Sequence, residues 1–422
     1  SVVCIGTATL GTHTMFNNIV DMGFYYGALI EGLETPGAAL VYGKMMLYKN
    51  YPSNPSNWCH IFSHWNNLMG ESSLQMWTSY PEMTTVEHSF SIPTGTNYID
   101  INVSKENGPV EEAWVTILMD DEIFESGYTN TNGHVRLPII SVQNGEVLVT
   151  VTKKNHYPYQ SSFQIYDPGV SIGLGESPYT LNDDNSGESN GNNDIMANGG
   201  ETLEIYVSGK NYGSEDATNV IAHISSLSNN VMIDSASSLV EFGNMIAGGT
   251  IVSEVPFVIS LNEGLSEGAN LDLFVEFTDE DGNSFNSVLD INVAGNILNS
   301  SGVDVLGSAS DVLMPGEASY VKIELNNSGS TAALSVTGTI TCASPFVEIL
   351  DNYGSWSIIS PGGSSYNDND YFEISTLEET IPGAVAHLIV NVESEEGYVS
   401  NSIIEVQIGE PTINDPVGPD AH

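Results

Sequence analysis

The sequence predicts a mostly β, multidomain protein that begins with a short α/β segment. The chain has 422 residues, which is too long for one hydrophobic core. Apolar residues recur at helical spacing in about the first eighty residues, and from about Val86 onward apolar and polar residues alternate as they do in strands. We therefore expect an α/β segment over residues 1–82, followed by three immunoglobulin-like β-sandwiches.

The N-terminal segment combines strand and helix patterns. Val2–Gly6 is a short apolar strand, and apolar residues are spaced for a helix from Thr14 to about Gly32. A second helix is expected after Pro36, because Pro favours the first turn of a helix. A third helix is predicted from about Trp58 to Leu68, and Ser73–Trp77 is predicted to be a closing strand.

The first sandwich is expected over residues 86–166. Tyr98–Val103, Ala113–Leu118 and Val147–Val151 have the alternation of strands, and clusters of Gly, Asn and Pro separate them. About seven short strands in some 80 residues are typical of an immunoglobulin-like sandwich.

An internal repeat occupies the rest of the chain, with one copy over residues 169–295 and another over 296–409. A Gly-Glu pair is followed, at the same offsets, by an Asn and a Gly: Gly200-Glu201, Asn211 and Gly213 in the first copy, and Gly316-Glu317, Asn327 and Gly329 in the second. Alternating strands follow both pairs, and the turns Asp281-Gly282 and Glu396-Gly397 lie near the ends of the copies. Residues 410–422, with three prolines, are predicted to be a linker.

The composition is strongly acidic. Fifty-four Asp and Glu against eight Lys and Arg give a formal net charge of −46, which repels nucleic acid and attracts cations. From Gly169 onward, only Lys210 and Lys322 are basic. A saline habitat and selection against trypsin-like cleavage both fit this bias. No apolar run reaches the roughly 18 residues of a membrane helix, so we expect no membrane insertion.

Three cysteines, Cys4, Cys59 and Cys342, are odd in number and far apart, which argues against a disulfide framework. We expect all three to be buried thiols. Cys4 and His13 lie close in sequence and could form a nucleophile and base. An apolar strand raises the pKa of a thiol, however, so no catalytic role is assigned to Cys4.

The densest polar cluster lies between residues 182 and 201 and predicts a calcium site. Calcium takes six to eight oxygen ligands, and a Gly-rich loop lets such ligands converge. A solvated acidic linker is the alternative, but packed carboxylates repel one another unless a cation neutralises them. The expected ligands are Asp183, Asp184, Asn185, Glu188, Asn190, Asn192, Asp194 and Glu201. The second copy retains only Asp304 and Asp311 in the equivalent stretch, so its site should be weaker or absent.

Cys59, His60 and His64 suggest a second, weaker metal pattern on the third predicted helix. The two histidines are four residues apart and share a helix face, as in helical zinc sites. No Glu lies beside the first His to serve as a base, and ordinary helix packing explains the three residues equally well.

Several N-terminal motifs resemble the C-terminal end of the peptidase domain of gingipain-type cysteine peptidases, a family of caspase-like fold. The resemblance is carried, in order, by Val2–Thr9, Thr12–Asn18, Gly23–Gly27, Gly37–Lys44 and Asn67–Thr78. In the last motif, Glu71 and Ser72 stand where the family usually has Asp and Pro. The motifs cover about eighty residues, and immunoglobulin-like modules follow the peptidase domain in that family too.

The resemblance implies a Cys/His pair that hydrolyses peptide bonds, with the His activating the thiolate. Both residues precede the strand that Val2–Ile5 resembles, so this chain is expected to lack them. Expected partners are an upstream peptidase segment, a peptide or protein substrate, and cell-surface or self-assembly partners. Such proteins are secreted bacterial proteins, exported to the cell surface by the type IX system.

Two functions follow from the sequence. The first, which the resemblance implies, is that the chain is a portion of a secreted gingipain-like endopeptidase, whose β-sandwiches would act as spacers or adhesion domains. Alternatively, it is a non-catalytic extracellular adhesion or assembly protein that retains a peptidase remnant. The residues before Ser1 should distinguish them, because only the peptidase needs a His-Gly and a Cys there.

Overall fold

The computed structural model describes residues 3–8, 13–139 and 142–411 and confirms a mostly β protein. The chain divides into two compact units, one formed by residues 1–92 with 98–166 and the other by 93–97 with 167–422. In the described parts of the chain, no helix is both long and apolar enough to cross a membrane. The predicted linker lies outside the described residues, except for Glu410 and Pro411.

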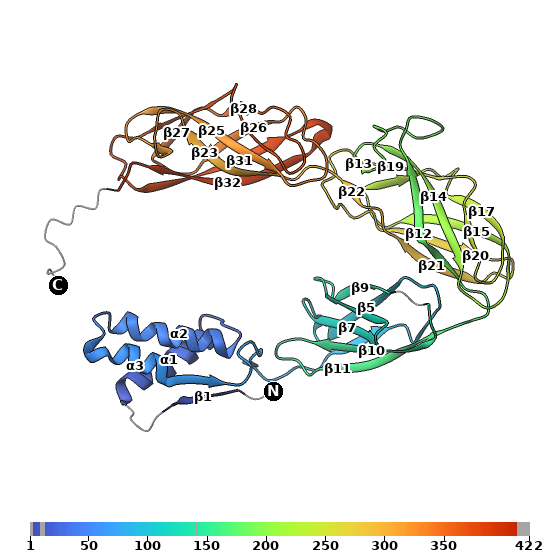
Figure 1. Cartoon of the computed structure of the whole chain (residues 1–422), viewed down its shortest axis with the longest axis horizontal. Coiled ribbons are helices and arrows are strands. Elements are labelled where there is room, and N and C mark those ends of the chain that lie inside the picture. Colours follow the sequence, from blue (N-terminus) through green and yellow to red (C-terminus); the bar gives the residue numbers. More distant parts are fainter. Residues whose placement is uncertain (1–2, 9–12, 140–141, 412–422) are drawn as a thin grey trace. The chain divides into compact units, whose positions relative to one another are not determined.

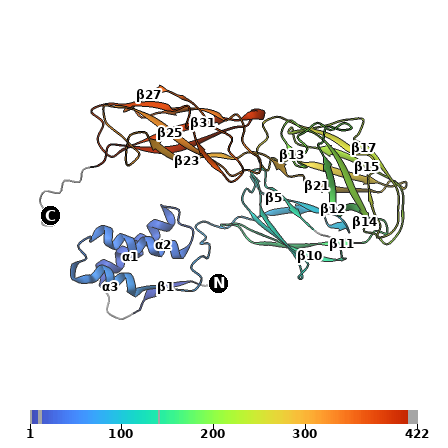
Figure 2. The ribbon, with the colours of Figure 1, turned by 45° about the horizontal axis from the view of Figure 1, so that its top comes forward.

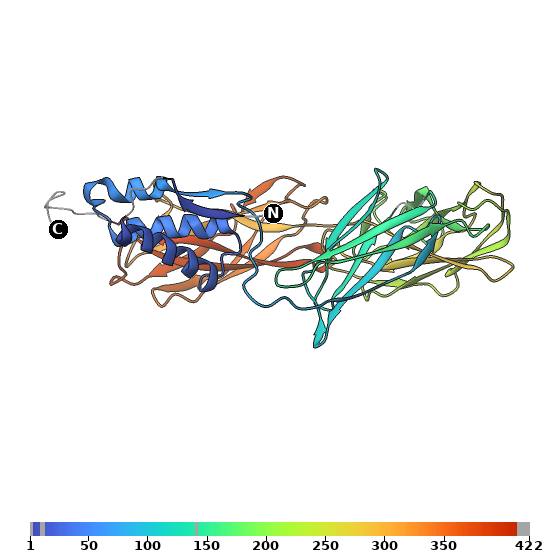
Figure 3. The ribbon, with the colours of Figure 1, turned by 90° about the horizontal axis from the view of Figure 1, so that it is seen from below.

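The first unit begins with three helices and a two-stranded antiparallel sheet, and the helices lie on one side of that sheet (Figures 1 and 3). The elements are β1 (Cys4–Thr7), α1 (Thr14–Leu29), α2 (Pro36–Asn50), a 3-10 turn (Pro55–Asn57), α3 (Trp58–Trp65) and β2 (Asn66–Met69). The three predicted helices are therefore present, but the third ends at Trp65, and the end predicted for it, up to Leu68, lies in β2. Pro36 opens α2, and the hydroxyl of Thr35 caps it by accepting a hydrogen bond from the Ala38 amide.

The predicted closing strand at Ser73–Trp77 is wrong, because a turn replaces it. The Glu71 carboxylate accepts hydrogen bonds from the amide and the hydroxyl of Ser73, and the Gly37 amide donates to the Ser72 carbonyl. The strand that pairs with β1 is instead β2, which follows α3 directly and aligns Cys4 with Met69. The last motif therefore packs its turn on the N-terminus of α2.

The first sandwich completes this unit with two antiparallel sheets (Figure 1). One has the order β4-β11-β10-β7-β8, and in the other β5 pairs with β3, β6 and β9. The strands are β3 (Thr85–His88), β4 (Ser91–Pro93), β5 (Tyr98–Lys105), β6 (Gly108–Pro109), β7 (Trp114–Met119), β8 (Ile123–Tyr128), β9 (His134–Pro138), β10 (Gly145–Thr152) and β11 (Tyr159–Tyr166). Alternate residues such as Ile101, Ile117 and Val149 are fully buried and form the core between the sheets.

The second unit contains the repeat. The strands of the first copy are β12 (Ile172–Asn182), β13 (Ala197–Asn198), β14 (Thr202–Asn211), β15 (Ala217–Ser226), β16 (Val231–Ile233), β17 (Leu239–Met245), β18 (Thr250–Val252), β19 (Phe257–Leu261), β20 (Leu273–Thr278), β21 (Ser284–Leu289) and β22 (Val293–Ala294). One sheet has the order β12-β14-β19-β16 and faces a sheet β17-β15-β20-β21, while β13 and β22 form a short parallel pair (Figure 2).

The second copy repeats this topology. Its strands are β23 (Leu298–Val305), β24 (Val312–Leu313), β25 (Ala318–Asn327), β26 (Thr337–Cys342), β27 (Val347–Asp351), β28 (Tyr353–Ser355), β29 (Ser364–Tyr366), β30 (Phe372–Thr376), β31 (Ala384–Glu393) and β32 (Val399–Ile408). The order β23-β25-β30-β27 matches that of the first copy, and the parallel pair of β24 with β32 matches that of β13 with β22. The two copies therefore share one strand order and one parallel pair.

The conserved offsets of the repeat have a structural cause at the end of β14 and of β25. The Asn211 side chain accepts a hydrogen bond from the Gly213 amide at 3.0 Å and donates to the carbonyls of Glu215 and Met245. Asn327 occupies the equivalent position in the second copy. A side chain in place of Gly213 would collide with the Gly169 carbonyl oxygen, so only Gly fits there.

Candidate functional site

The predicted calcium loop folds over the outer face of β14 and is organised by buried carboxylates. Asp183 is 1% exposed, and its two oxygens accept hydrogen bonds from the amides of Asp194 and Ile195. Glu201, at the start of β14, is 8% exposed and accepts from the amides of Asn192 and Asn198, both at 3.0 Å. The loop thus wraps its backbone around two acids that approach each other.

Gly191 lies between these two carboxylates. A Cβ there would stand 2.7 Å from the Cβ of Asp183 and 2.9 Å from Oε1 of Glu201. Burial, with the nearby charges of Asp183 and Asp194, raises the pKa of Glu201 to about 7, against the opposing effect of its two amide hydrogen bonds. The Glu201 carboxylate is therefore poorly compensated, and a cation would stabilise its charged form.

The other predicted ligands lie apart from this centre or serve the loop itself. Asp184 is exposed, and hydrogen bonds from the hydroxyl and the amide of Ser186 lower the pKa of this carboxyl. Asn185 is exposed and bonds to the backbone of Gly191. Glu188 and Asn190 are also exposed. Of the predicted ligands, the structure brings together the carboxylates of Asp183 and Glu201 with the main-chain amides of Asn192 and Asp194, whose own side chains are exposed. The other four lie outside this centre.

Glu204 is a buried acid of this region that the sequence did not reveal. It is 6% exposed and accepts from the Glu188 amide at 2.8 Å and from the Asn182 side chain at 3.1 Å. Side chains alternate along a strand, so Glu204 lies on the other face of β14 from its neighbours Leu203 and Ile205, which belong to the core. The sequence pattern therefore predicts that Glu204 faces solvent. Only the fold of the acidic loop over this face buries it.

The side-chain oxygens of this loop are the type of ligand that calcium prefers. The side chains of Asp183, Asp194 and Glu201 offer carboxylate oxygens, which hard cations prefer. Within the residues that the structure describes, however, no group of three or more His, Cys, Asp or Glu side chains converges closely enough to hold a metal ion. Main-chain and Asn oxygens would have to complete the ligand shell.

The equivalent residues of the second copy are arranged differently. Glu317, which corresponds to Glu201, is exposed. Asp304 instead pairs with Lys322 at 2.7 Å, and the Asp311 carboxylate accepts a hydrogen bond from the Val305 amide.

The thiols and histidines of the helical segment form no catalytic pair among the described contacts. Cys59 is buried, and burial raises the pKa of its thiol. Cys4 is exposed, so the expectation of a buried thiol is wrong here: β1 pairs only with β2, and nothing described covers Cys4. The His13 ring lies 5.1 Å from that of Phe16 and 6.1 Å from that of Trp58, within an aromatic cluster.

His60 and His64 share one face of α3, as predicted. Their rings are 4.4 Å apart in an edge-to-face arrangement, and both residues are exposed. The described residues supply no third ligand to this pair.

The architecture defines a mostly β, multi-sandwich protein with a small helical segment. No family model matches the sequence, and no curated protein matches it significantly. Among solved structures, the Arg-specific cysteine proteinase gingipain R is 14% identical, over 39% of this chain and 37% of that chain, with a TM-score of 0.31. A complex of pro- and mature gingipain domains from Porphyromonas gingivalis is 13% identical, over 39% and 38%, with a TM-score of 0.32.

A calcium-stabilised adhesin with which an Antarctic bacterium binds ice is 11% identical, over 82% of this chain and 79% of that chain, with a TM-score of 0.19. The chain spans less than two fifths of the length of the gingipain structures it matches. At such TM-scores, none of these likenesses carries an argument about function.

Proposed function

We propose that this chain is a portion of an extracellular, gingipain-like cysteine endopeptidase, in which the helical segment completes a peptidase domain. In this proposal, the Cys/His pair lies on a segment upstream of this chain. The sandwiches space that domain from the bacterial surface, and peptides or proteins are the substrates. The gingipain-type motifs quoted above and one feature of the helical segment support it.

That feature is the apolar surface of the helical segment. Its core cluster contains six described buried residues, among them Phe16, Leu47 and Phe62. Large apolar side chains are exposed on α1, α2 and the residue after α1 at the same time: Met15, Met22, Tyr25, Tyr26, Leu29, Ile30, Val41, Met45 and Tyr48. Surfaces of this kind mark an interface, and a two-stranded sheet is rarely stable without further cover. An upstream peptidase segment is the cover we propose.

An activity probe tests this proposal on the native secreted protein. A biotinylated peptidyl acyloxymethyl ketone, which alkylates active-site thiolates, should label a polypeptide that co-purifies with this chain. Pre-treatment with iodoacetamide is the control and should abolish labelling. If the native material under reducing, calcium-containing conditions shows no labelled polypeptide and no peptide hydrolysis, the non-catalytic adhesion or assembly protein becomes the better account.

We also propose that calcium binds at Asp183, Asp194 and Glu201 and stabilises the first copy of the repeat. The buried Glu201 carboxylate, with its raised pKa and two acidic neighbours, is the observation behind this. Calorimetry of the full chain with calcium and with a chelator tests it. Calcium should raise one melting transition, and the Asp183→Asn variant should lose that response. An unchanged transition would show that the loop needs no cation.

A further inference from the structure

One face of the first sandwich carries a row of exposed aromatic and hydroxyl side chains. Tyr128 on β8 lies directly opposite Trp114 on β7, and Thr152 on β10 lies opposite Trp114 on its other side. The neighbours Ala113 and Val115 are fully buried, so the row points away from the core. Trp114 is 39% exposed and Tyr128 is 64% exposed.

The two rings form a tilted pair. Their centroids are 4.5 Å apart, and the ring planes meet at 59°. Tyr and Trp rings have an apolar body and a polar tip, so they suit surfaces that bind partly polar ligands. The two rings contact each other, and both residues lie on hydrogen-bonded strands, so the rings are held in place without a ligand.

The rest of this sheet face is uncharged over the next two rows. The second row has hydroxyl and amide side chains, and the third is mainly apolar: Thr116, Ser126, Thr150 and Gln160, then Leu118, Phe124, Leu148 and Ser162. In a chain with a net charge of −46, a face without a carboxylate over three rows is unusual. The nearest carboxylates are Glu146, which accepts a hydrogen bond from the Ser162 hydroxyl at 2.6 Å, and Glu112, which lines the adjoining cleft.

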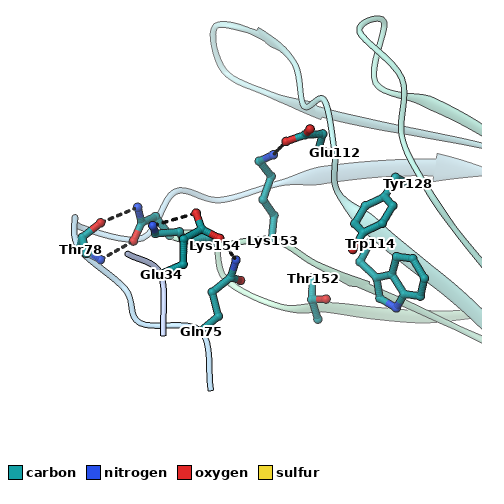
Figure 4. A pocket seen from close by; sticks show the side chains of 10 residues that line it. Glu34, Gln75, Thr78, Glu112, Trp114, Tyr128, Thr152, Lys153 and Lys154 are labelled. Carbon is teal, nitrogen blue, oxygen red and sulfur yellow. Dashed lines mark hydrogen bonds and ion pairs between the residues drawn. The ribbon is translucent and has the colours of Figure 1, made fainter. Parts of the chain in front are cut away.

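A cleft of about 660 Å³ adjoins the aromatic row (Figure 4). Its other wall carries Gln75, Thr78 and Asn155. Its two cations are already engaged, because Lys154 pairs with Glu34 at 3.0 Å and the Lys153 ammonium donates to the Glu111 carbonyl. The volume lies within the range of small-ligand sites. The lining combines aromatic rings, neutral hydrogen-bonding groups and the carboxylates Glu34 and Glu112, each of which lies within 4.0 Å of a lysine.

We propose that this face is a binding site for a neutral oligosaccharide, with one sugar ring packed on Trp114 and Tyr128. A pyranose presents apolar C–H groups on its faces and hydroxyls at its rim. The aromatic row matches the faces, and Thr152, Gln75 and the second row of the sheet match the rim. An anionic sugar is disfavoured, since the chain is strongly acidic and the cations of the cleft are paired. The inference does not depend on the peptidase proposal.

Binding of defined glycans to the full chain tests the site. The probes are cellohexaose, chitohexaose and mannohexaose, with a heparin hexasaccharide as the anionic comparison. The chain has five tryptophans, so its indole N–H signals are few enough for NMR titration, and the Trp114→Phe variant identifies the signal of Trp114. At least one neutral hexasaccharide should shift that signal at millimolar concentration or below.

The variant Trp114→Ala should weaken binding about tenfold or more, because the stacking surface is lost. Trp114→Tyr should restore part of it. Phe90→Ala is the matched control, because Phe90 is an aromatic residue of the same unit that is 89% exposed and lies outside the cleft. Thermal melting verifies that each variant is folded.

Each of the following results would overturn the proposal: no binding of any neutral glycan, stronger binding of the heparin fragment, or equal affinity for wild type and Trp114→Ala. A response confined to Phe124→Ala would assign the glycan to the apolar end of the sheet and would likewise reject the aromatic row. Failure of the peptidase proposal leaves these measurements unaffected.

Discussion

Asn327 makes in the second repeat copy the hydrogen bonds that Asn211 makes in the first. Its side-chain oxygen accepts from the Gly329 amide at 3.0 Å, and its side-chain nitrogen donates to the carbonyls of Thr331 and Ile359 at 2.7 and 3.0 Å. Both Asn residues are fully buried. Each side-chain amide satisfies several backbone groups at a buried position that water does not reach. This explains why both copies have an Asn at the same offset.

Replacing either residue should destabilise its own module. Asn211→Ala and Asn327→Ala each leave buried carbonyls and amides without partners, at a cost of about 2–4 kcal/mol in the free energy of unfolding. Chemical denaturation followed by near-UV circular dichroism measures this. Asn326→Ala is the control, because that side chain is only partly buried and makes one long hydrogen bond of 3.3 Å. Equal effects of Asn326→Ala and Asn327→Ala would contradict the assignment.

The pKa of Glu201 predicts a pH dependence in the first copy. The folded-state pKa of about 7 exceeds the unfolded value of 4.5, so the folded state holds the proton more tightly. Without calcium, the free energy of unfolding should therefore fall as the pH rises from about 4.5 to 7. Calcium binds the charged carboxylate and should flatten that fall at neutral pH.

A matched pair of variants tests this dependence. In chelator, Glu201→Gln should lower stability slightly, because a Gln side chain has one acceptor oxygen for two amides, and should remove the slope between pH 4.5 and 7. Glu317→Gln, at the equivalent exposed position of the second copy, should change neither stability nor slope. Calorimetric melting at a series of pH values measures both, and a slope that survives in Glu201→Gln would contradict the assignment.

Glu267 predicts a pH-sensitive junction between the two repeat copies. Its carboxylate accepts hydrogen bonds from the Gly295 amide at 2.9 Å, the Ser330 amide at 3.1 Å and the Ser330 hydroxyl at 2.6 Å. Burial opposes the charge, but these bonds outweigh it and lower the pKa of Glu267. A depressed folded-state pKa stabilises the junction above the unfolded value of 4.5, and this contribution is lost as the pH falls below it.

Residual dipolar couplings of the two copies measure the junction directly. Glu267→Gln should loosen the relative alignment of the copies at neutral pH, whereas Glu254→Gln, at an exposed position of the first copy, should not. Wild type at a pH well below 4.5 should resemble Glu267→Gln. If the couplings fit one rigid body in every case, the Glu267 contacts do not hold the junction.

Local sequence patterns were enough to predict the strands. The differences between prediction and structure arise from contacts between residues far apart in the sequence. Strand alternation and the Asn–Gly offsets located β14 and β25, because both signals lie within a few residues. The approach of Asp183 to Glu201 followed from loop composition. The burial of Glu204 did not, because it depends on which loop covers the strand.

Non-local contacts also explain why the sequence did not predict the aromatic row and why two expectations for the helical segment were incorrect. Trp114 meets Tyr128 through the register of β7 and β8, which the two strand patterns alone leave undetermined. An apolar strand such as Cys4–Thr7 predicts burial, but the two-stranded sheet leaves Cys4 uncovered. The segment from Ser73 to Trp77 has the composition of a strand, yet the hydrogen bonds of Glu71 to Ser73 turn the chain.

Cys4 and Cys59 differ in exposure and should therefore differ in reactivity. Cys4 is exposed, whereas Cys59 is fully buried and its sulfur contacts the carbonyls of Leu47 and Tyr51 at 3.6 and 3.5 Å. Burial raises the pKa of the Cys59 thiol, so little thiolate forms near neutral pH. In the isolated chain, iodoacetamide should therefore modify Cys4 first and Cys59 only after unfolding. Peptide mass spectrometry over time measures this, with Cys4→Ser as the control.

An upstream segment that covers the helical segment should slow modification of Cys4 in the native secreted protein, and equal rates in both preparations would argue against such a cover.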